Sequence, residues 1–207
     1  MEVDQVRREA RKYFDGVDSS HDWHHVKRVE ILAERIAEEE DADWKVVKLA
    51  VLLHDIGRGK EDRGEIEDHA RWGAREATDI LGSNGYSEEV VEEVMHCILA
   101  HRYSGDVEPE TVEAEVLSDA DNLDALGATG VARTFCYSGE HGRALADIER
   151  MHGEDLGRET GLKHLTNKIL SLKERMYTGT GKEMAEERHR FVEDFVAQMK
   201  EEVKGER

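Results

Sequence analysis

The sequence predicts an all-α protein organised as one helical domain. Residues of one helix face recur at the spacing of an α-helix, for example His25, Val29, Leu32 and Ile36. No segment of the sequence keeps the alternation of apolar and polar residues that marks a β-strand. The chain has 207 residues, one proline and no low-complexity linker, so we expect a single domain over residues 1–207.

The sequence predicts nine helices, several of them separated by glycine-containing stretches. They cover residues 2–14, 22–40, 43–55, 66–82, 87–101, 112–127, 129–138, 161–177 and 182–203. Ahead of the second helix, the stretch DSSHD provides Ser19 as an N-cap, with Asp22 three residues later. The stretches GRG, GSNG, YSG and YTGTG separate later segments.

Three of these helices show a buried face most clearly. One face of 87–101 carries Val90, Val94, Ile98 and His101, and one face of 182–203 carries Met184, Phe191, Phe195 and Met199. The segment 43–55 is a nearly continuous apolar run that ends in His54 and Asp55. Two proton-binding groups at the edge of a core cost free energy unless a partner satisfies them. This pair is therefore the first candidate for a functional site.

The chain is strongly acidic, with 48 acidic and 29 basic side chains and a net charge of −19. Nucleic-acid backbones require a basic surface, so we expect no nucleic-acid partner. The acidic surface fits either a generally soluble protein or one adapted to high internal salt, where screening weakens the repulsion. A phosphate-binding site on such a chain needs local positive charge, from a metal ion or from clustered Arg and Lys side chains.

The sequence carries no membrane, secretion or disulfide signal. No apolar stretch approaches the roughly 20 residues of a membrane span, and no apolar run follows a basic start. We therefore expect a soluble, cytoplasmic protein without a membrane partner. Cys97 and Cys136 stand alone, without C-x-x-C spacing, so neither a disulfide framework nor a cysteine zinc site is indicated.

Polar groups at core-facing positions and helix ends form the candidate site. His25 lies on an apolar helix face, His54 and Asp55 finish an apolar helix, and Asp121 shares a helix face with Asp124. Taken singly, each is more typical of a hydrogen-bonded core residue, a helix cap or an acidic helix start. Together they offer two imidazoles and two carboxylates, a set of donors that suits a divalent cation.

Five stretches of the chain carry a family pattern. They are SHDWHHVKRV, LLHDIGRGK, CILAHRYS, LSDADNLDALGATGVARTF and the tail KHLTNKILSLKERMYTGTGKEMAEERHRFVEDF. With them the sequence resembles the HD superfamily of metal-dependent phosphohydrolases, whose signature is H…HD…D, and most closely its small bacterial and archaeal members that act on nucleotides. The resemblance implies an HD-type helical bundle with core motifs at about 19–130 and C-terminal helices of 160–203 packed on them.

The resemblance also implies a divalent metal ion. The ligands that it implies are His25, His54, Asp55 and Asp121. Mn, Fe, Co, Ni or Zn suits such nitrogen and oxygen ligands better than Mg. The ion would polarise the phosphoryl group and activate the attacking water. A second ion, held by His69 with His96 or His101, is an arrangement that we do not favour.

Several further residues are implied to act on the substrate. The catalytic residues would be Asp55, Arg58 and His101, and the substrate contacts would be Arg58, Lys60, His96, His101, Arg102 and Asp124. Asp55 could orient the water, Arg58 could bind the charge that develops on the phosphate, and His101 could protonate the leaving group. Without the resemblance, Arg58 and Lys60 are typical of solvated loop cations.

Two points of detail stay open. Some relatives carry an acid four residues after the motif histidine, where this chain has Arg58, so the general base is open among Glu61, Asp62, Glu65 and Asp68. In the tail, Lys168 and Arg188 are either further phosphate contacts or partners in helical salt bridges.

We therefore expect a phosphohydrolase that cleaves a phosphate ester or anhydride of a small nucleotide by metal-activated water. The resemblance favours a nucleoside or deoxynucleoside triphosphate, although the sequence contains neither a Walker A loop nor a G-x-G-x-x-G turn. Two alternatives remain: a non-catalytic, metal- or nucleotide-binding regulatory module, and a di-iron oxygenase of the HD type. The sequence leaves open the bond that is cleaved and the oligomeric state.

Overall fold

The computed structural model describes residues 2–17, 21–102, 105–147 and 159–206. These residues form α-helices and short 3₁₀ segments, and among them one isolated bridge, Ala144 with Thr160, is the only β-type pairing. The helices are α1 (Glu2–Arg11), α2 (Trp23–Glu39), α3 (Trp44–Leu53), α4 (Arg58–Asp62), α5 (His69–Ser83), α6 (Glu88–Ala100), α7 (Val112–Asp124), α8 (Gly127–Glu140), α10 (Gly161–Asn167) and α11 (Gly179–Lys204), with 3₁₀ segments η1 (Lys12–Phe14) and η2 (Ile169–Arg175). The all-α fold class predicted from the sequence is confirmed. No helix in the described ranges is long and apolar enough to cross a membrane.

Helix α3 forms the centre of the core. Its residues from Leu49 to Leu53 are all fully buried, and α1, α2, α5, α6 and α7 all contact it. From Leu49 on, the helix is covered on every side, which explains why this part of its sequence is an unbroken apolar run. His54 and Asp55, which follow its C-terminal end, therefore lie in the interior of the molecule.

The N-cap of helix α2 lies three residues after the expected one. Asp22, not Ser19, is the N-cap, and its side chain accepts a hydrogen bond from the backbone N–H of His25. Asp and Ser are equally good caps, and the acid sits directly before the first helical residue. Ser19 lies outside the described residues.

Several helix ends differ from the expected positions by up to three residues, and two segments differ by more. The short helix α4 follows His54 and Asp55, where no helix was expected. The expected helix 161–177 is divided into α10 and the 3₁₀ segment η2. At the division the Thr166 hydroxyl donates to the carbonyl oxygens of Leu162 and Lys163, and the Ser171 hydroxyl donates to that of Lys168. Such side-chain bonds compete with the regular backbone pattern, so the α-helix does not continue.

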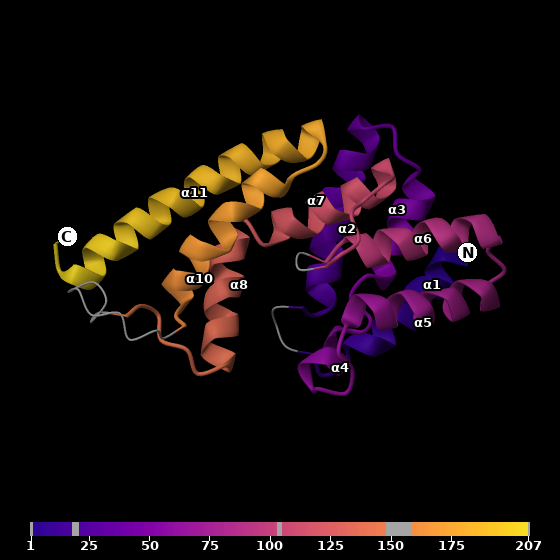
Figure 1. The fold of residues 1–207 in the computed structure, drawn as a ribbon, viewed down its shortest axis with the longest axis horizontal. Helices are drawn as coiled ribbons and strands as arrows, with labels where there is room; N and C mark the ends of the chain where they lie inside the picture. Colours follow the sequence, from indigo (N-terminus) through magenta and orange to yellow (C-terminus); the bar gives the residue numbers. More distant parts are fainter. Residues whose placement is uncertain (1, 18–20, 103–104, 148–158, 207) are drawn as a thin grey trace.

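The C-terminal helices extend away from the α1–α7 body, with the two chain ends on opposite sides (Figure 1). Helix α11 packs on α7 and α8, and its start is tied to α7 by a buried carboxylate. Asp119 accepts hydrogen bonds from the backbone N–H groups of Tyr177 and Thr178 at 2.9 and 2.8 Å, and from the Thr178 hydroxyl at 2.7 Å. A methyl group at Gly181 would overlap this carboxylate, so glycine is needed there. Of the C-terminal elements, α8, α10 and η2 contribute residues to the cavity described below.

Candidate metal centre

Four buried imidazoles surround one carboxylate, that of Asp55. His25 lies on α2, His54 follows α3, His69 begins α5 and His101 follows α6. The Nε2 atoms of His25 and His54 lie 3.6 and 3.7 Å from Oδ2 of Asp55. The Nε2 atoms of His69 and His101 lie 3.4 and 3.7 Å from Oδ1 of the same residue. Each carboxylate oxygen therefore faces its own pair of histidines.

The other ring nitrogen of each histidine already has a partner. Nδ1 of His54 is 2.8 Å from the carbonyl oxygen of Val51, and Nδ1 of His101 is 2.6 Å from that of Ile98. A carbonyl oxygen can only accept a hydrogen bond, so Nδ1 is the donor in both rings. In a neutral imidazole this leaves Nε2 with a free lone pair that points at Asp55.

Carboxylates hold the remaining two rings in the same way. Nδ1 of His25 donates to Oδ2 of Asp124 at 2.8 Å, and Nδ1 of His69 donates to Oε2 of Glu61, also at 2.8 Å. Histidines that bind metals are usually oriented by such a bond from the second nitrogen, which also makes the first nitrogen a better donor to the ion. All four rings thus present Nε2 inward.

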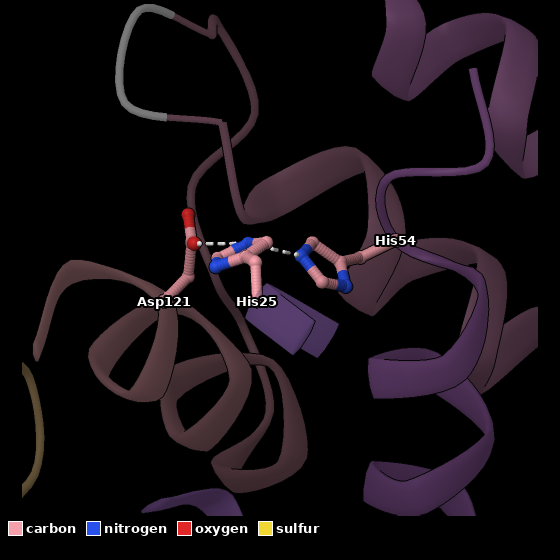
Figure 2. A group of neighbouring side chains, drawn as sticks. All are labelled: His25, His54 and Asp121. Carbon is pink, nitrogen blue, oxygen red and sulfur yellow. Dashed lines mark hydrogen bonds and ion pairs between the residues drawn. The ribbon is translucent and has the colours of Figure 1, made fainter. Parts of the chain in front are cut away.

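Asp121 completes the first of two ligand clusters. Its Oδ1 lies 3.3 Å from Nε2 of His25, and Nε2 of His25 lies 3.3 Å from Nε2 of His54 (Figure 2). The facing atoms of these three residues all lie within 4.8 Å of one another. A second set with the same property consists of Asp55, His69 and His101. Asp55 links the two sets, because its other carboxylate oxygen faces His25 and His54.

Burial and the facing carboxylates shift the pKa values of the four histidines in different directions. Burial lowers the pKa of His54 to about 4, and burial also lowers that of His69, so both rings are neutral at neutral pH. Burial alone would raise the pKa of Asp55, but the facing imidazoles of His54 and His101 bring it well below its usual range. Burial lowers the pKa of His25 and His101, yet facing carboxylates outweigh it and raise both values.

The donor atoms are arranged for an ion rather than for each other. Two lone pairs 3.3 Å apart, as on His25 and His54, repel unless a proton or cation lies between them. Two donors bound to one ion at about 2.1 Å stand about 3 Å apart. The observed separations between donor atoms, from 3.3 to 3.7 Å, are close to that spacing. Nitrogen and carboxylate donors fit Mn, Fe, Co, Ni or Zn.

The three acids of the DADNLD stretch have three different surroundings. Asp119 ties α11 to α7, Asp121 faces the imidazoles, and Asp124 holds His25. Asp124 was expected to contact substrate, but it is 1 % exposed, and His25, Arg28 and Arg133 occupy its two oxygens. Asp124 does not line the cavity, so the structure gives no support to it as a substrate contact.

The expected cations divide into two groups. Arg58 and Arg102 line the cavity, and both form ion pairs with Glu61, at 3.2 and 3.1 Å. Lys60 lies two residues beyond Arg58, so it projects from another side of α4. Its ammonium group sits 5.2 Å from the centre of the Trp72 ring and outside the cavity. The structure therefore gives no support to Lys60 as a substrate contact.

Of the two expected companions of His69, the structure brings only one to the centre. His101 lies in the second cluster with its Nε2 toward Asp55, so it is placed as a potential ligand, and it also lines the cavity. His96 lies five residues earlier on α6, about 140° around the helix, and accepts from the backbone N–H of Glu110 at 2.9 Å. It does not line the cavity.

Two residues at the cavity and the centre, His21 and Gly57, were not among the expected site residues. His21 lines the cavity, and its ring centre is 5.8 Å from that of His25, but it precedes α2 and belongs to no periodic pattern. Gly57 allows α5 to approach, because a Cβ there would lie 2.6 Å from the carbonyl oxygen of His69.

Arg188, one of the two tail candidates, donates a hydrogen bond to the carbonyl oxygen of Leu123 and does not line the cavity.

The cavity beside the two clusters has a volume of about 540 Å³. Asp55, Asp121 and His101 form one end, and Arg58 and Arg102 lie beside them. The opposite wall comes from α8, α10 and η2. Ligand pockets in proteins commonly measure about 300–1,000 Å³, so the volume suits a small molecule such as a mononucleotide.

The family follows from comparison with known proteins. The model of the HD domain matches residues 22–126, which contain both clusters. YpgQ of Bacillus subtilis (strain 168) is 36% identical over 208 residues, covering 99% of this chain and 95% of YpgQ. The chain belongs to the HD-domain family. Ribonuclease Y of Borreliella burgdorferi matches this HD protein at 37% identity over 120 residues, which are only 22% of that enzyme.

Solved structures agree over nearly the whole HD protein. The crystal structure of B. subtilis YpgQ in complex with ADP has a TM-score of 0.77 and 33% sequence identity, and covers 98% of both chains. An HD-superfamily hydrolase from Bacillus thuringiensis has a TM-score of 0.74 at 32% identity, covering 97% of this chain and 95% of its own. The chain therefore has the fold of the HD-superfamily hydrolases together with clusters of His and Asp that could hold a metal ion.

Proposed function

We propose that this HD protein is a metal-dependent phosphohydrolase that cleaves a phosphate ester or anhydride of a small nucleotide. The observation that carries the proposal is the convergence of four Nε2 atoms on Asp55, with every Nδ1 already bonded. Such a set of donors has one common chemical use, which is to bind a divalent cation.

The first metal site would be built by the residues of the family signature. These are His25, His54, Asp55 and Asp121. The second cluster, Asp55 with His69 and His101, would hold a second ion, and Asp55 would serve both. Divalent ions held by these residues would polarise phosphoryl oxygens and lower the pKa of bound water toward neutrality. We favour Mn, Fe, Co, Ni or Zn over Mg for this donor set.

The cations beside the clusters would bind the phosphate. Arg58 is flanked by Glu61 and Asp62, at 3.2 and 3.4 Å, and its guanidinium lines the cavity. Arg102 pairs with Glu61 and Asp68 from the opposite side. These acids hold the two guanidinium groups in place, and bidentate contacts from Arg are well suited to phosphate oxygens.

A nucleotide substrate is supported by the relatives and by the cavity. YpgQ of B. subtilis was crystallised with ADP, and the cavity here has a volume of about 540 Å³. A nucleoside or deoxynucleoside triphosphate is the substrate that we favour within this class. The net charge of −19 argues against a nucleic-acid polymer as substrate.

Adjacent histidines offer a matched test of this function. His25 is fully buried in the first cluster, while His24 beside it is exposed. We expect His25→Ala to lose bound metal and at least about 100-fold of nucleotide hydrolysis, and His24→Ala to keep both. Nucleoside mono-, di- and triphosphates with several divalent metals would be assayed by product chromatography. Turnover by His25→Ala at the wild-type rate with added Mn would contradict the proposal.

The paired clusters also favour a second candidate, a di-iron oxygenase of the HD type, which requires two neighbouring metal sites. Iron loading separates the candidates. An oxygenase would show a visible absorption band with iron and oxygen consumption, whereas the phosphohydrolase would release phosphate or pyrophosphate. A regulatory module would be stabilised by nucleotide without turnover in any metal.

A further inference from the structure

Four of the side chains that line the cavity are neutral and deeply buried. Asn122 of α7 and Thr134 of α8 are 7% and 5% exposed, and Ile169 and Leu172 of η2 are 4% and 2% exposed. The segment η2 also packs against α7, the helix that carries Asn122. The other lining side chains include several cations, among them Lys168 of the tail. The cavity therefore offers neutral polar and apolar groups as well as charged ones.

Asn122 and Thr134 make no side-chain hydrogen bond within the part of the chain that the structure describes. Thr178 is buried to a similar extent, but its hydroxyl donates to Asp119 at 2.7 Å. Buried polar side chains in proteins are normally paired in this way. The polar atoms of Asn122 and Thr134 are not sealed from solvent, and the cavity is the space that both residues line. Their amide and hydroxyl groups are thus open to a molecule in the cavity.

Both residues are next to the metal centre in the sequence. Asn122 directly follows Asp121, and successive residues of an α-helix are turned by about 100°, so its amide lies beside the first cluster and not in it. Thr134 directly follows Arg133, which donates to Asp124 at 2.9 Å. A molecule whose phosphate is held at the clusters therefore has a neighbouring part of its structure within reach of Asn122 and Thr134.

The chemistry of these side chains suits an uncharged group. Phosphate oxygens are bound best by charged donors such as Arg, whereas an amide and a hydroxyl pair well with neutral donors and acceptors. The apolar side chains of Ile169 and Leu172 suit a ring with apolar faces. The nucleoside part of a nucleotide has both properties, because its base and its sugar are rings with neutral polar groups at their edges.

We propose that Asn122 and Thr134, with Ile169 and Leu172, bind the uncharged nucleoside part of the substrate through neutral hydrogen bonds. This inference rests on the proposed function, because it assigns residues that determine specificity to the same site. A substrate that lacks the matching polar group leaves the amide or the hydroxyl unpaired in a site closed to water. Enzymes discriminate strongly between substrates under that condition.

Two probes isolate the contribution of the nucleoside without requiring turnover. Adenosine 5′-(α,β-methylene)diphosphate and methylenediphosphonate share a P–C–P group and differ in the nucleoside. Calorimetric titration into Mn-loaded protein gives the ratio of their affinities. We expect Asn122→Leu with Thr134→Val to lower this ratio at least about tenfold, because two neutral hydrogen bonds are lost at nearly constant shape.

Two further variants serve as controls for these substitutions. Thr134→Ser keeps the hydroxyl and should leave the affinity ratio within about threefold of wild type. Thr78→Val removes a hydroxyl that donates to the carbonyl oxygen of Ala74 at 3.0 Å, outside the cavity, and should leave the ratio unchanged.

Thermal denaturation without ligand separates binding from a structural role. Neither Asn122 nor Thr134 has a partner to lose within the described residues, so Asn122→Leu and Thr134→Val should leave the unfolding midpoint unchanged or raise it. A lower midpoint together with an unchanged affinity ratio would assign both side chains to the fold and overturn the proposal.

The 2′-deoxyadenosine analogue distinguishes the two parts of the nucleoside. An equal fall of the ratio for both analogues assigns the hydrogen bonds to groups other than the 2′-hydroxyl, and a fall for the ribose analogue alone assigns them to that hydroxyl. An unchanged ratio in the folded, Mn-loaded double variant overturns the subsite even if nucleotides are hydrolysed. A selective loss of the nucleoside contribution, without hydrolysis of any nucleotide by wild type, leaves the subsite standing and rejects the phosphohydrolase.

Discussion

At the scale of single residues, the role of each polar side chain depends on what its second polar atom contacts. His25 and His69 are oriented by carboxylates, whereas His54 and His101 are oriented by backbone carbonyl oxygens. Asp124 belongs with these orienting groups. Burial alone would raise the pKa of Asp124, but the hydrogen bond with His25 and the arginines Arg28 and Arg133 bring it down to about 2.

Asp124→Asn tests this orienting role. We expect metal affinity to fall about 10- to 100-fold, because the amide can no longer accept strongly from Nδ1 of His25. Competition with a metal chelator measures the affinity, and circular dichroism reports whether the fold is retained. A raised KM for nucleotide with unchanged metal affinity would instead restore Asp124 to the substrate contacts expected from the sequence.

The sequence identifies the signature residues, but it does not show which contact each of the neighbouring acids makes. Asp119, Asp121 and Asp124 lie within one and a half turns of α7, and the direction of each depends on what packs against it. Asp119 accepts a hydrogen bond from the backbone N–H of Tyr177, which lies 58 residues later in the chain, directly ahead of α11. No local pattern carries that information. His69 is similar, because its approach to Asp55 depends on packing at Gly57.

At the scale of elements, the centre depends on how closely α5 approaches the end of α3. Gly57 permits this contact, since a Cβ would lie 2.6 Å from the backbone of His69. We expect Gly57→Ala to displace α5 and to destabilise the protein by about 1–3 kcal/mol. It should also lower the number of metal ions bound per chain, because His69 would leave Asp55.

Metal analysis and thermal denaturation measure the two effects. Gly82→Ala, in open space on α5, is the matched control and should be neutral or slightly stabilising. Unchanged metal content in a folded Gly57→Ala protein would contradict the proposed dependence of the second cluster on this contact.

Helix α1 is joined to α2 by a charged pair whose strength depends on pH. Arg7 donates to both oxygens of Glu30, one at 2.8 Å, and these bonds lower the pKa of Glu30. A carboxylate with a lowered pKa in the folded state stabilises the fold above its unfolded pKa of about 4.3, and the contribution disappears as the pH falls.

Glu30→Gln should therefore cost about 1 kcal/mol at pH 7 and almost nothing at about pH 3. Urea denaturation at the two pH values measures this difference. The exposed Glu34 on the same helix supplies the control variant Glu34→Gln. A cost for Glu30→Gln that is equal at both pH values would show that the charge of Glu30 plays no part.

At the scale of the whole molecule, the chain has a net charge of −19, yet several arginines and a lysine line its cavity. The helical class follows from periodicity because apolar spacing is a local property, and the structure confirms it over the described ranges. The cavity could not be predicted, because its wall joins α8, α10 and the segment of Arg143 to helices from the first half of the chain.

The net charge of −19 predicts a salt dependence of stability. Raising NaCl from about 0.1 M to 1 M shortens the screening length from about 10 to 3 Å and weakens repulsion within the folded chain. We expect the midpoint of thermal unfolding to rise by several degrees. A constant or falling midpoint would indicate that acidic and basic groups already balance locally.

Anomalous X-ray diffraction from crystals grown with Mn tests the metal centre most directly. We predict a peak at the manganese edge within bonding distance, about 2.2 Å, of Nε2 of His25 and His54 and of the carboxylates of Asp55 and Asp121. A second peak should lie between Asp55, His69 and His101. Manganese bound elsewhere with no peak among the four signature side chains would contradict the account.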